Sequence, residues 1–386
     1  MKEDLFSILN LNNREDARIF AKEIGVSVTE LAYYNDNCIY PDYNIIKKIL
    51  NYNQDLTELE LKIRLGHIDS EILSYLQKNV KEISSICNPA AKETNVKREL
   101  PHAQFSTSLG KLYKADCLEI MDSLPDESVD LIFADPPFNL KKEYESGVND
   151  GLSKTSYLNW SEKWITESIR ILKKGGSLFI WNLPSWNTYT AEILNKYLNL
   201  RHWIAVDIKY SLPIPNKLYP SHYSLLYYVK GDKPTSFNQE RLPLEICRHC
   251  GGDIKDYGGY KNKLNTEGIS LTDVWRDISP VRHKKYKNRT SNELPLNLLE
   301  RIISLSTKKG DMVFDPFGGS GTTYVVSEIL KRRWIGTEIG PIDIIEDRFK
   351  NLEFPSLLIQ QIQDSKNQLF TEEMKKIRTK NGYWLS

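Results

Sequence analysis

The sequence has few cysteines, no long apolar run and almost no net charge. Five cysteines in 386 residues are too few for a disulfide framework, so we expect them to be reduced. No run reaches the roughly 18 apolar residues that a membrane-spanning helix needs. The first six residues carry mixed charges without the apolar core of a signal peptide. These absences predict a cytoplasmic protein without a membrane partner.

Charge is spread unevenly along the chain although the net charge is only +1. Residues 1–100 carry 13 Lys and Arg against 16 Asp and Glu, a net charge of −3. Residues 241–290 carry 11 Lys and Arg against 6 Asp and Glu, a net charge of +5. The basic segment indicates either a localised contact with a polyanion or a solvated loop.

Residues 1–83 have the pattern of a helical domain. A helix is predicted over 14–23, a second one begins after Ser27 with Glu30 completing a capping box, and a third covers 42–50. Two short helices joined by a glycine turn resemble a helix-turn-helix, whereas the net charge of −3 favours a packing or dimerisation role. Both roles remain open. Residues 84–107 lack periodicity and are predicted to be a linker.

From residue 108 onward strands alternate with helices, which predicts a doubly wound, mostly parallel α/β sheet of the Rossmann-like type in a domain over 108–350. Strands are predicted at 112–113, 129–134, 177–181, 203–209, 223–229, 312–314 and 334–338, and helices at 161–172, 295–305 and 322–330. Residues 232–290 break this rhythm and are predicted to be an insertion at the ligand-binding edge. Residues 351–386 are predicted to form a helical tail.

A glycine-rich turn follows the strand at 312–314. It consists of Asp315, Pro316, Phe317, Gly318, Gly319, Ser320, Gly321, Thr322 and Thr323. Glycines allow a ligand to approach the backbone and the helix N-terminus. Glu338 ends the next strand 17 residues after Gly321, close to the roughly 20-residue offset at which an acid meets a ribose. The pattern favours a nucleoside cofactor; a structural tight turn is the alternative.

A carboxylate followed by two prolines and an aromatic ring ends the strand at 129–134. These residues are Asp135, Pro136, Pro137 and Phe138. An aromatic amine is a poor nucleophile because its lone pair is delocalised into the ring. Asp135 and the Pro136 carbonyl can each accept one amino hydrogen and localise that lone pair, while Phe138 can stack on the base. A rigid turn with an exposed Asp is the alternative.

Together the two motifs resemble those of the S-adenosylmethionine-dependent amino DNA methyltransferases. The resemblance covers about residues 108–350, and the order of the motifs, catalytic before cofactor, is that of the β class. It implies a mixed sheet with one antiparallel strand, a target-recognition insertion at about 232–290 and a flipped base held by Asp135 to Phe138.

The resemblance also implies the residues that bind S-adenosylmethionine. Residues 315–323 would wrap the methionine part, and Glu338 would bind the ribose. Asp135 would also contact the cofactor. Asp116 and Cys117 match the family's segment near the adenine. Asn292 stands in a run, 291–295, where the family has Thr-Gln-Lys-Pro; here Asn-Glu replaces Gln-Lys.

The residues also bear on the base that is methylated. Cytosine C5 chemistry needs a cysteine nucleophile, generally after proline, and no Pro-Cys pair occurs. Asp at position 135 favours adenine N6, and cytosine N4 is the alternative. An RNA amino methyltransferase and a non-catalytic DNA-binding regulator are further alternatives.

A basic cluster in the insertion predicts contact with double-stranded DNA. It contains Arg282, Lys284, Lys285, Lys287 and Arg289, which can neutralise phosphates. The setting that follows is a bacterial or phage-encoded restriction-modification system with a cognate restriction endonuclease, and a monomer or a homodimer. Cys247 and Cys250 have the spacing of half a zinc site; because a second pair is missing, reduced thiols in a turn are favoured and a zinc site is the alternative.

Overall fold

The computed structural model describes residues 2–86, 99–140, 151–207, 215–216, 218, 220–247, 249–252, 254, 256, 258–279, 281 and 293–385. These residues fall into two compact units. The first takes its residues from 1–98, 139–142 and 149–163, and the second takes the remainder. The first unit therefore includes short stretches of the region that was assigned from sequence to the α/β domain.

The first unit is built from short helices around an apolar core. They are α1 (Leu5–Ile8), α2 (Arg14–Glu23), α3 (Val28–Asn37), α4 (Tyr43–Tyr52), α5 (Glu58–Arg64), α6 (Ser70–Lys78) and α7 (Val80–Ile86). Ser27 caps α3 by accepting a hydrogen bond from the backbone N–H of Thr29 at 3.2 Å, as its sequence predicts. Ile45, Ile46 and Ile49 form the buried face of α4, so the predicted helical periodicity is confirmed.

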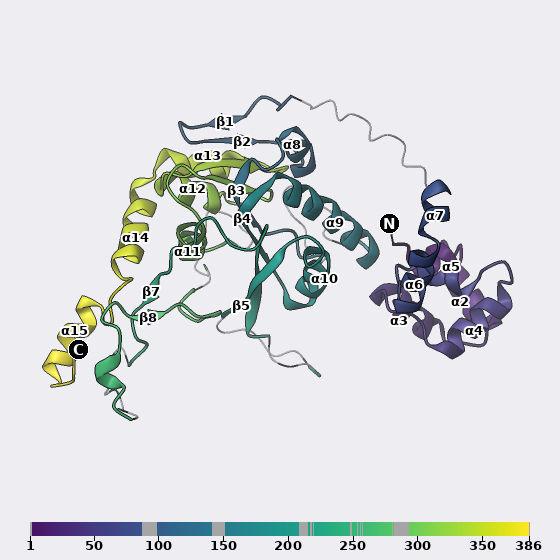
Figure 1. Cartoon of the computed structure of the whole chain (residues 1–386), viewed down its shortest axis with the longest axis horizontal. Coiled ribbons are helices and arrows are strands. Elements are labelled where there is room, and N and C mark those ends of the chain that lie inside the picture. Colours follow the sequence, from purple (N-terminus) through teal and green to yellow (C-terminus); the bar gives the residue numbers. More distant parts are fainter. Residues whose placement is uncertain are drawn as a thin grey trace. The chain divides into compact units, whose positions relative to one another are not determined.

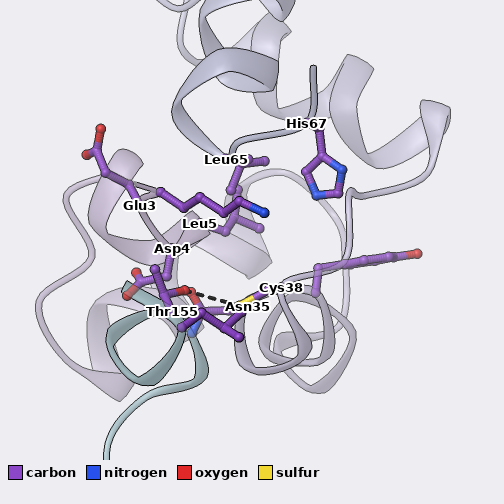
Figure 2. A pocket seen from close by; sticks show the side chains of 11 residues that line it. Glu3, Asp4, Leu5, Asn35, Cys38, Leu65, His67 and Thr155 are labelled. Carbon is purple, nitrogen blue, oxygen red and sulfur yellow. Dashed lines mark hydrogen bonds between the residues drawn. The ribbon is translucent and has the colours of Figure 1, made fainter. Parts of the chain in front are cut away.

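The start of α9 (Lys154–Ile171) belongs to the first unit. Lys154 Nζ donates a hydrogen bond to the carbonyl oxygen of Asn37 at 2.7 Å. Figure 2 shows a small pocket beside this contact, where Thr155 Oγ1 lies 3.1 Å from Cys38 Sγ. Residues that follow the predicted catalytic motif in the chain are thus held by the N-terminal helices.

The second unit is organised around a nine-stranded sheet (Figure 1). Its order is β1-β2-β11-β10-β3-β4-β6-β5-β9. The strands are β1 (Phe105–Ser106), β2 (Gly110–Tyr113), β3 (Val129–Ala134), β4 (Leu172–Asn182), β5 (Asn199–Asp207), β6 (His222–Val229), β9 (Val274–Trp275), β10 (Met312–Asp315) and β11 (Arg333–Thr337). Strands β2, β11, β10, β3 and β4 are parallel, and β6 runs antiparallel to β4 and β5. The predicted mixed sheet is confirmed.

The boundary between α9 and β4 differs from the predicted one. The helix was predicted over 161–172 and the strand over 177–181, whereas α9 begins at Lys154 and β4 already begins at Leu172. The pairing of β4 with β3 is irregular between its partners Leu172 and Ser177. Gly175, with φ of +78°, allows the extra residues to bulge out of the strand instead of ending it.

Further helices of the second unit are α8 (Cys117–Ser123), α10 (Pro184–Leu194), α11 (Leu296–Ser306), α12 (Thr322–Ile329), α13 (Asp343–Lys350), α14 (Glu353–Asp364) and α15 (Glu372–Lys380). Helix α12 packs on β10 and β11, α11 and α14 pack on α12, and α10 packs on β4 and β6. Within the described residues, none of the helices combines the length and apolarity needed to cross a membrane.

The insertion and the C-terminal tail form one substructure. Strands β7 (Arg241–Leu242) and β8 (Ile269–Ser270) pair with each other, and η1 (Lys261–Lys263) lies between them in the chain. The tail joins this pair because the backbone N–H of Asn367 donates to the carbonyl of Arg241 at 2.9 Å. Figure 1 shows α14 and α15, in yellow, beside β7 and β8.

Candidate functional site

The two sequence motifs lie at the ends of adjacent parallel strands. β3 and β10 pair in parallel, with Leu131 opposite Val313 and Ile132 opposite Phe314. Asp135 directly follows β3, and Asp315 ends β10. The carboxyl ends of parallel strands meet at one edge of the sheet, which is where open α/β sheets bind ligands. The fold therefore brings together residues that are 180 positions apart in the sequence.

Aromatic side chains surround the end of the first motif. The rings of Phe138 and Tyr223 have centroids 6.1 Å apart, and Tyr223 lies 4.8 Å from Trp181. Trp186 Nε1 donates a hydrogen bond to the carbonyl oxygen of Phe138 at 2.7 Å. Aromatic rings of this kind can stack on a planar base that binds at this site.

The residue after Phe138 marks a sharp change in chain direction. Asn139 has φ of +53°, a left-handed conformation that Asn tolerates better than most residues. Its Nδ2 donates a hydrogen bond to the carbonyl of Leu152 at 2.9 Å. The end of the motif is thus anchored on both sides.

Asp315 is the structural centre of the glycine turn. Its side chain is only 3% exposed. Oδ1 accepts a hydrogen bond from the backbone N–H of Phe317 at 2.9 Å, and Oδ2 accepts one from Thr323 Oγ1 at 2.5 Å. These bonds close the turn onto the first residues of α12. Asp315 and Thr323, both predicted as cofactor ligands, here use their side chains to shape the turn.

The glycines of the turn are required by its geometry. Gly319 and Gly321 have φ of +54° and +74°, where residues with a Cβ are strained. A Cβ on Gly318 would lie 2.6 Å from Tyr324 Oη and 2.8 Å from the carbonyl oxygen of Thr337. The turn therefore has no room for a side chain at Gly318, and its backbone needs glycine at 319 and 321.

Glu338 lies beside this turn, as its spacing predicts. Its Oε2 accepts a hydrogen bond from the backbone N–H of Gly319 at 2.7 Å, and its Oε1 accepts one from Gly340 at 2.8 Å. A carboxylate oxygen has a second lone pair, so each oxygen can still accept a hydroxyl. A glycine turn with a carboxylate at its side fits a nucleoside whose ribose presents two hydroxyls.

Asp116 and Cys117 start α8 at the same edge, since β2 pairs in parallel with β11. Asp116 caps the helix by accepting from the backbone N–H of Leu118 at 2.8 Å. Cys117 is 5% exposed, and burial, with the Asp116 charge as a smaller cause, raises the pKa of its thiol. Cys117 is therefore a neutral, buried side chain at the start of α8.

Several residues at the site carry no motif in the sequence. Tyr223 and Trp186 contact Phe138 of the first motif, Arg348 donates a hydrogen bond to the turn, and Glu293 pairs with Arg348. Of these four residues, only Glu293 could have been noticed in the sequence. It lies in the run 291–295, where a glutamate replaces the lysine of the family's Thr-Gln-Lys-Pro. The other three come from elements far away in the chain.

Some predicted residues lie outside the described part of the chain. They are Arg282, Lys284, Lys285, Lys287, Arg289 and Asn292. Cys247 and Cys250 lie within the part of the chain that the structure describes, and both are exposed. Backbone N–H groups of Cys250 and His249 lower the pKa of the Cys247 thiol. Among the described residues, no group of three or more His, Cys, Asp or Glu side chains is arranged to hold a metal ion.

The sequence of this chain is similar to a family model and to several known proteins. The family model described as DNA methylase matches residues 129–346. M.BamHI, a type II methyltransferase of Bacillus amyloliquefaciens, is 52% identical over 94% of this chain and 86% of its own length. The DNA adenine methyltransferase YhdJ of Escherichia coli (strain K12) is 31% identical over 61% of this chain and 80% of its own.

Two solved structures align with part of this chain. The cytosine-N4-specific PvuII DNA methyltransferase aligns with a TM-score of 0.48 at 21% identity, covering 68% of this chain and 95% of that one. M1.HpyAVI in complex with S-adenosylmethionine aligns with a TM-score of 0.43 at 21% identity, covering 64% and 100%. The family model and the relative that is similar along almost the whole chain are decisive: the chain belongs to the DNA methylase family, the amino DNA methyltransferases that use S-adenosylmethionine as methyl donor.

Proposed function

We propose that this chain methylates the exocyclic amino nitrogen of one base in a specific duplex DNA sequence, with adenine N6 as the first candidate. The observation that carries the proposal is the pairing of β3 with β10. It sets the amine-binding motif, Asp135 to Phe138, beside the turn at 315–323. Donor and acceptor sites at neighbouring strand ends suit a direct transfer between two bound molecules.

Three residues of the motif have defined parts in the proposed mechanism. Asp135 and the Pro136 carbonyl accept the two amino hydrogens and localise the nitrogen lone pair. Phe138 stacks on the base, which must leave the helix to reach this site. The cofactor supplies an electrophilic methyl group on a sulfonium. Asp135 then takes the proton that the nitrogen loses and passes it to solvent.

The residues at 315–323 and Glu338 are proposed to hold the cofactor. Gly319 and Gly321 give the turn the backbone conformation that we expect to contact the methionine part, and Glu338 accepts from the ribose hydroxyls. Asp116 and Cys117 form the wall near the adenine, and Cys117 is suited to that part because it is buried and neutral. Asn292 is proposed from the family run alone.

The choice of base depends on few observations. Asp135 is a strong acceptor and suits the weakly nucleophilic adenine amine, and one relative, YhdJ, is named as a DNA adenine methyltransferase. Cytosine N4 presents the same two amino hydrogens and is the alternative. Mass spectrometry of nucleosides from DNA methylated by the purified protein distinguishes N6-methyl-2′-deoxyadenosine from N4-methyl-2′-deoxycytidine directly.

The mechanism is tested at Asp135. Asp135→Ala is expected to abolish methyl incorporation into duplex DNA while S-adenosylmethionine still binds. Asp126→Ala is the matched control, because Asp126 is a mostly exposed carboxylate that pairs with Arg170 before β3 begins. Full activity of Asp135→Ala would remove the basis of the mechanism, and loss of activity in both variants would point to misfolding.

The partner and setting are proposed from the basic cluster and from the relatives. Several relatives are named as type II methyltransferases, which supports a role beside a restriction endonuclease. Arg282, Lys284, Lys285, Lys287 and Arg289 are proposed to contact phosphates. Competition between duplex DNA and RNA of the same sequence tests the substrate class, and preference for RNA would contradict the proposal.

A further inference from the structure

A buried ion pair lies against the cofactor turn. Arg348 on α13 and Glu293, just before α11, approach to 3.5 Å between Nη1 and Oε1. Their side chains are 9% and 4% exposed. Burying two charges costs free energy that their attraction only partly returns. Such a pair is therefore weak evidence for a purely stabilising role.

The arginine of this pair holds the turn directly. Arg348 Nη1 donates to the carbonyl oxygen of Ser320 at 2.8 Å and to Thr322 Oγ1 at 2.9 Å. Thr322 Oγ1 in turn donates to the carbonyl of Leu294 at 3.3 Å. One guanidinium thus connects α13, the turn and the chain segment that contains Glu293.

Helix α13 also limits the turn sterically. A Cβ on Gly321 would lie 2.8 Å from Ile345 Cγ2, one helical turn before Arg348. The turn is therefore packed against α13 at one residue and hydrogen-bonded to it at the next. Its backbone has little freedom to move away from the edge of the sheet.

The charges have a consequence for the ligand. S-adenosylmethionine carries a positive sulfonium, whereas its product, S-adenosylhomocysteine, has a neutral thioether at the same place. An unpaired arginine beside the turn would repel the first ligand and not the second. Two charges interact more strongly in a partly buried site than in water, because the effective dielectric constant is lower there. Glu293 cancels the arginine charge without taking away its hydrogen bonds to the turn.

We propose that Glu293 and Arg348 are a positioning pair for the methyl donor: Arg348 fixes the turn, and Glu293 makes the site electrostatically acceptable to a cation. This proposal rests on the proposed cofactor site at 315–323. It gives a role to the one charged residue that departs from the Thr-Gln-Lys-Pro run of the family.

The test compares Glu293→Gln with Glu300→Gln. Glu300 is a matched control because it also belongs to a buried pair, with Lys366, whose side chains are 0% and 3% exposed. Calorimetric titration measures the affinity of each variant for S-adenosylmethionine and S-adenosylhomocysteine, and scanning calorimetry measures its melting temperature. Glu293→Gln is expected to weaken binding of the sulfonium ligand roughly threefold to tenfold more than that of the thioether.

The control separates a positioning role from plain stability. Glu300→Gln is expected to lower the melting temperature while the ratio of the two affinities stays that of the wild type. An unchanged ratio in Glu293→Gln, with a melting temperature as low as that of the control, overturns the proposal. Glu338→Ala tests the underlying site separately: if it binds S-adenosylmethionine like the wild type, the cofactor site itself is wrong.

A second variant keeps the test decisive if Glu293→Gln does not fold. Arg348→Lys preserves the charge and removes hydrogen-bond donors. Amide hydrogen exchange of residues 318–322 in protein without cofactor is expected to become faster, while the affinity ratio stays unchanged. Wild-type exchange at these amides, or a changed ratio, contradicts the roles assigned to the pair.

Discussion

The indole Nε1 of Trp186 donates a hydrogen bond to the carbonyl oxygen of Phe138 at 2.7 Å, across 48 residues of sequence. Trp186 lies in α10, which follows β4, whereas Phe138 follows β3. Since β3 and β4 are parallel neighbours, the bond connects the segment after β3 with the start of α10 at the same edge of the sheet. It holds the backbone that carries the ring proposed to stack on the base.

Loss of this bond is expected to impair turnover more than folding. Trp186→Phe keeps an aromatic ring and removes the donor, so the backbone that carries Phe138 loses a hydrogen bond that holds it in place. We expect kcat to fall about tenfold, which corresponds to about 1.4 kcal/mol, with unchanged affinity for S-adenosylmethionine. Single-turnover methylation measures the effect. Trp203→Phe, a change at a more exposed tryptophan of β5, is the control, and equal losses in both variants would contradict this role for Trp186.

Filling the glycine turn is expected to abolish cofactor binding. In Gly318→Ala the new methyl group meets the Thr337 carbonyl at 2.8 Å and Tyr324 Oη at 2.6 Å. Overpacking of this kind costs about 1–3 kcal/mol, and the turn must shift to relieve it. Equilibrium dialysis with labelled S-adenosylmethionine reports the loss.

A matched variant distinguishes crowding from backbone strain. A Cβ on Gly310 meets open space although its φ is +86°. Gly310→Ala is therefore expected to lose some stability through strain and to keep its affinity for the cofactor. Wild-type affinity in Gly318→Ala would show that the turn does not bind the ligand.

Stability is expected to fall in alkaline solution because of Cys117. Burial raises the pKa of its thiol above the ordinary value of 9.0, so the thiol stays protonated in the folded protein while it ionises in the unfolded chain. The contribution is complete below pH 9 and is lost as the pH rises above it. The free energy of unfolding should fall by about 1.4 kcal/mol more between pH 8 and 10 in the wild type than in Cys117→Ala. Urea titrations at both pH values measure this difference. An equal fall in the free energy of unfolding in the wild type and in Cys117→Ala would contradict it.

Neutralising the basic cluster is expected to weaken DNA binding in a salt-dependent manner. If Lys284 and Lys285 each contact a phosphate, the double change to Ala lowers the slope of log K against log salt by about 2. Fluorescence anisotropy at several salt concentrations gives the slope. Changing Lys375 and Lys376 of α15 to Ala is the control for a general loss of charge, and an equal effect there would argue against a dedicated phosphate contact.

The positions of the two motifs were predictable because each motif is a short stretch that follows a strand. Asp135 to Phe138 follow a continuous apolar strand, and the turn at 315–323 follows another, so their positions at strand ends could be inferred from periodicity alone. Capping residues such as Ser27 were equally local. The β4 boundary was not predictable in this way, because Gly175 can either end a helix or bulge out of a strand, and pairing with β3 decides between them.

By itself, the sequence determined the two motifs, their order and the sheet that carries them, since each depends on residues that are neighbours in the chain. Only the tertiary structure decided what surrounds these motifs. Trp186 reaches Phe138, and Arg348 pairs with Glu293 at the turn, through contacts between elements far apart in sequence. Such contacts leave no periodic trace, because they depend on which strands are neighbours and on how helices pack at the sheet edge.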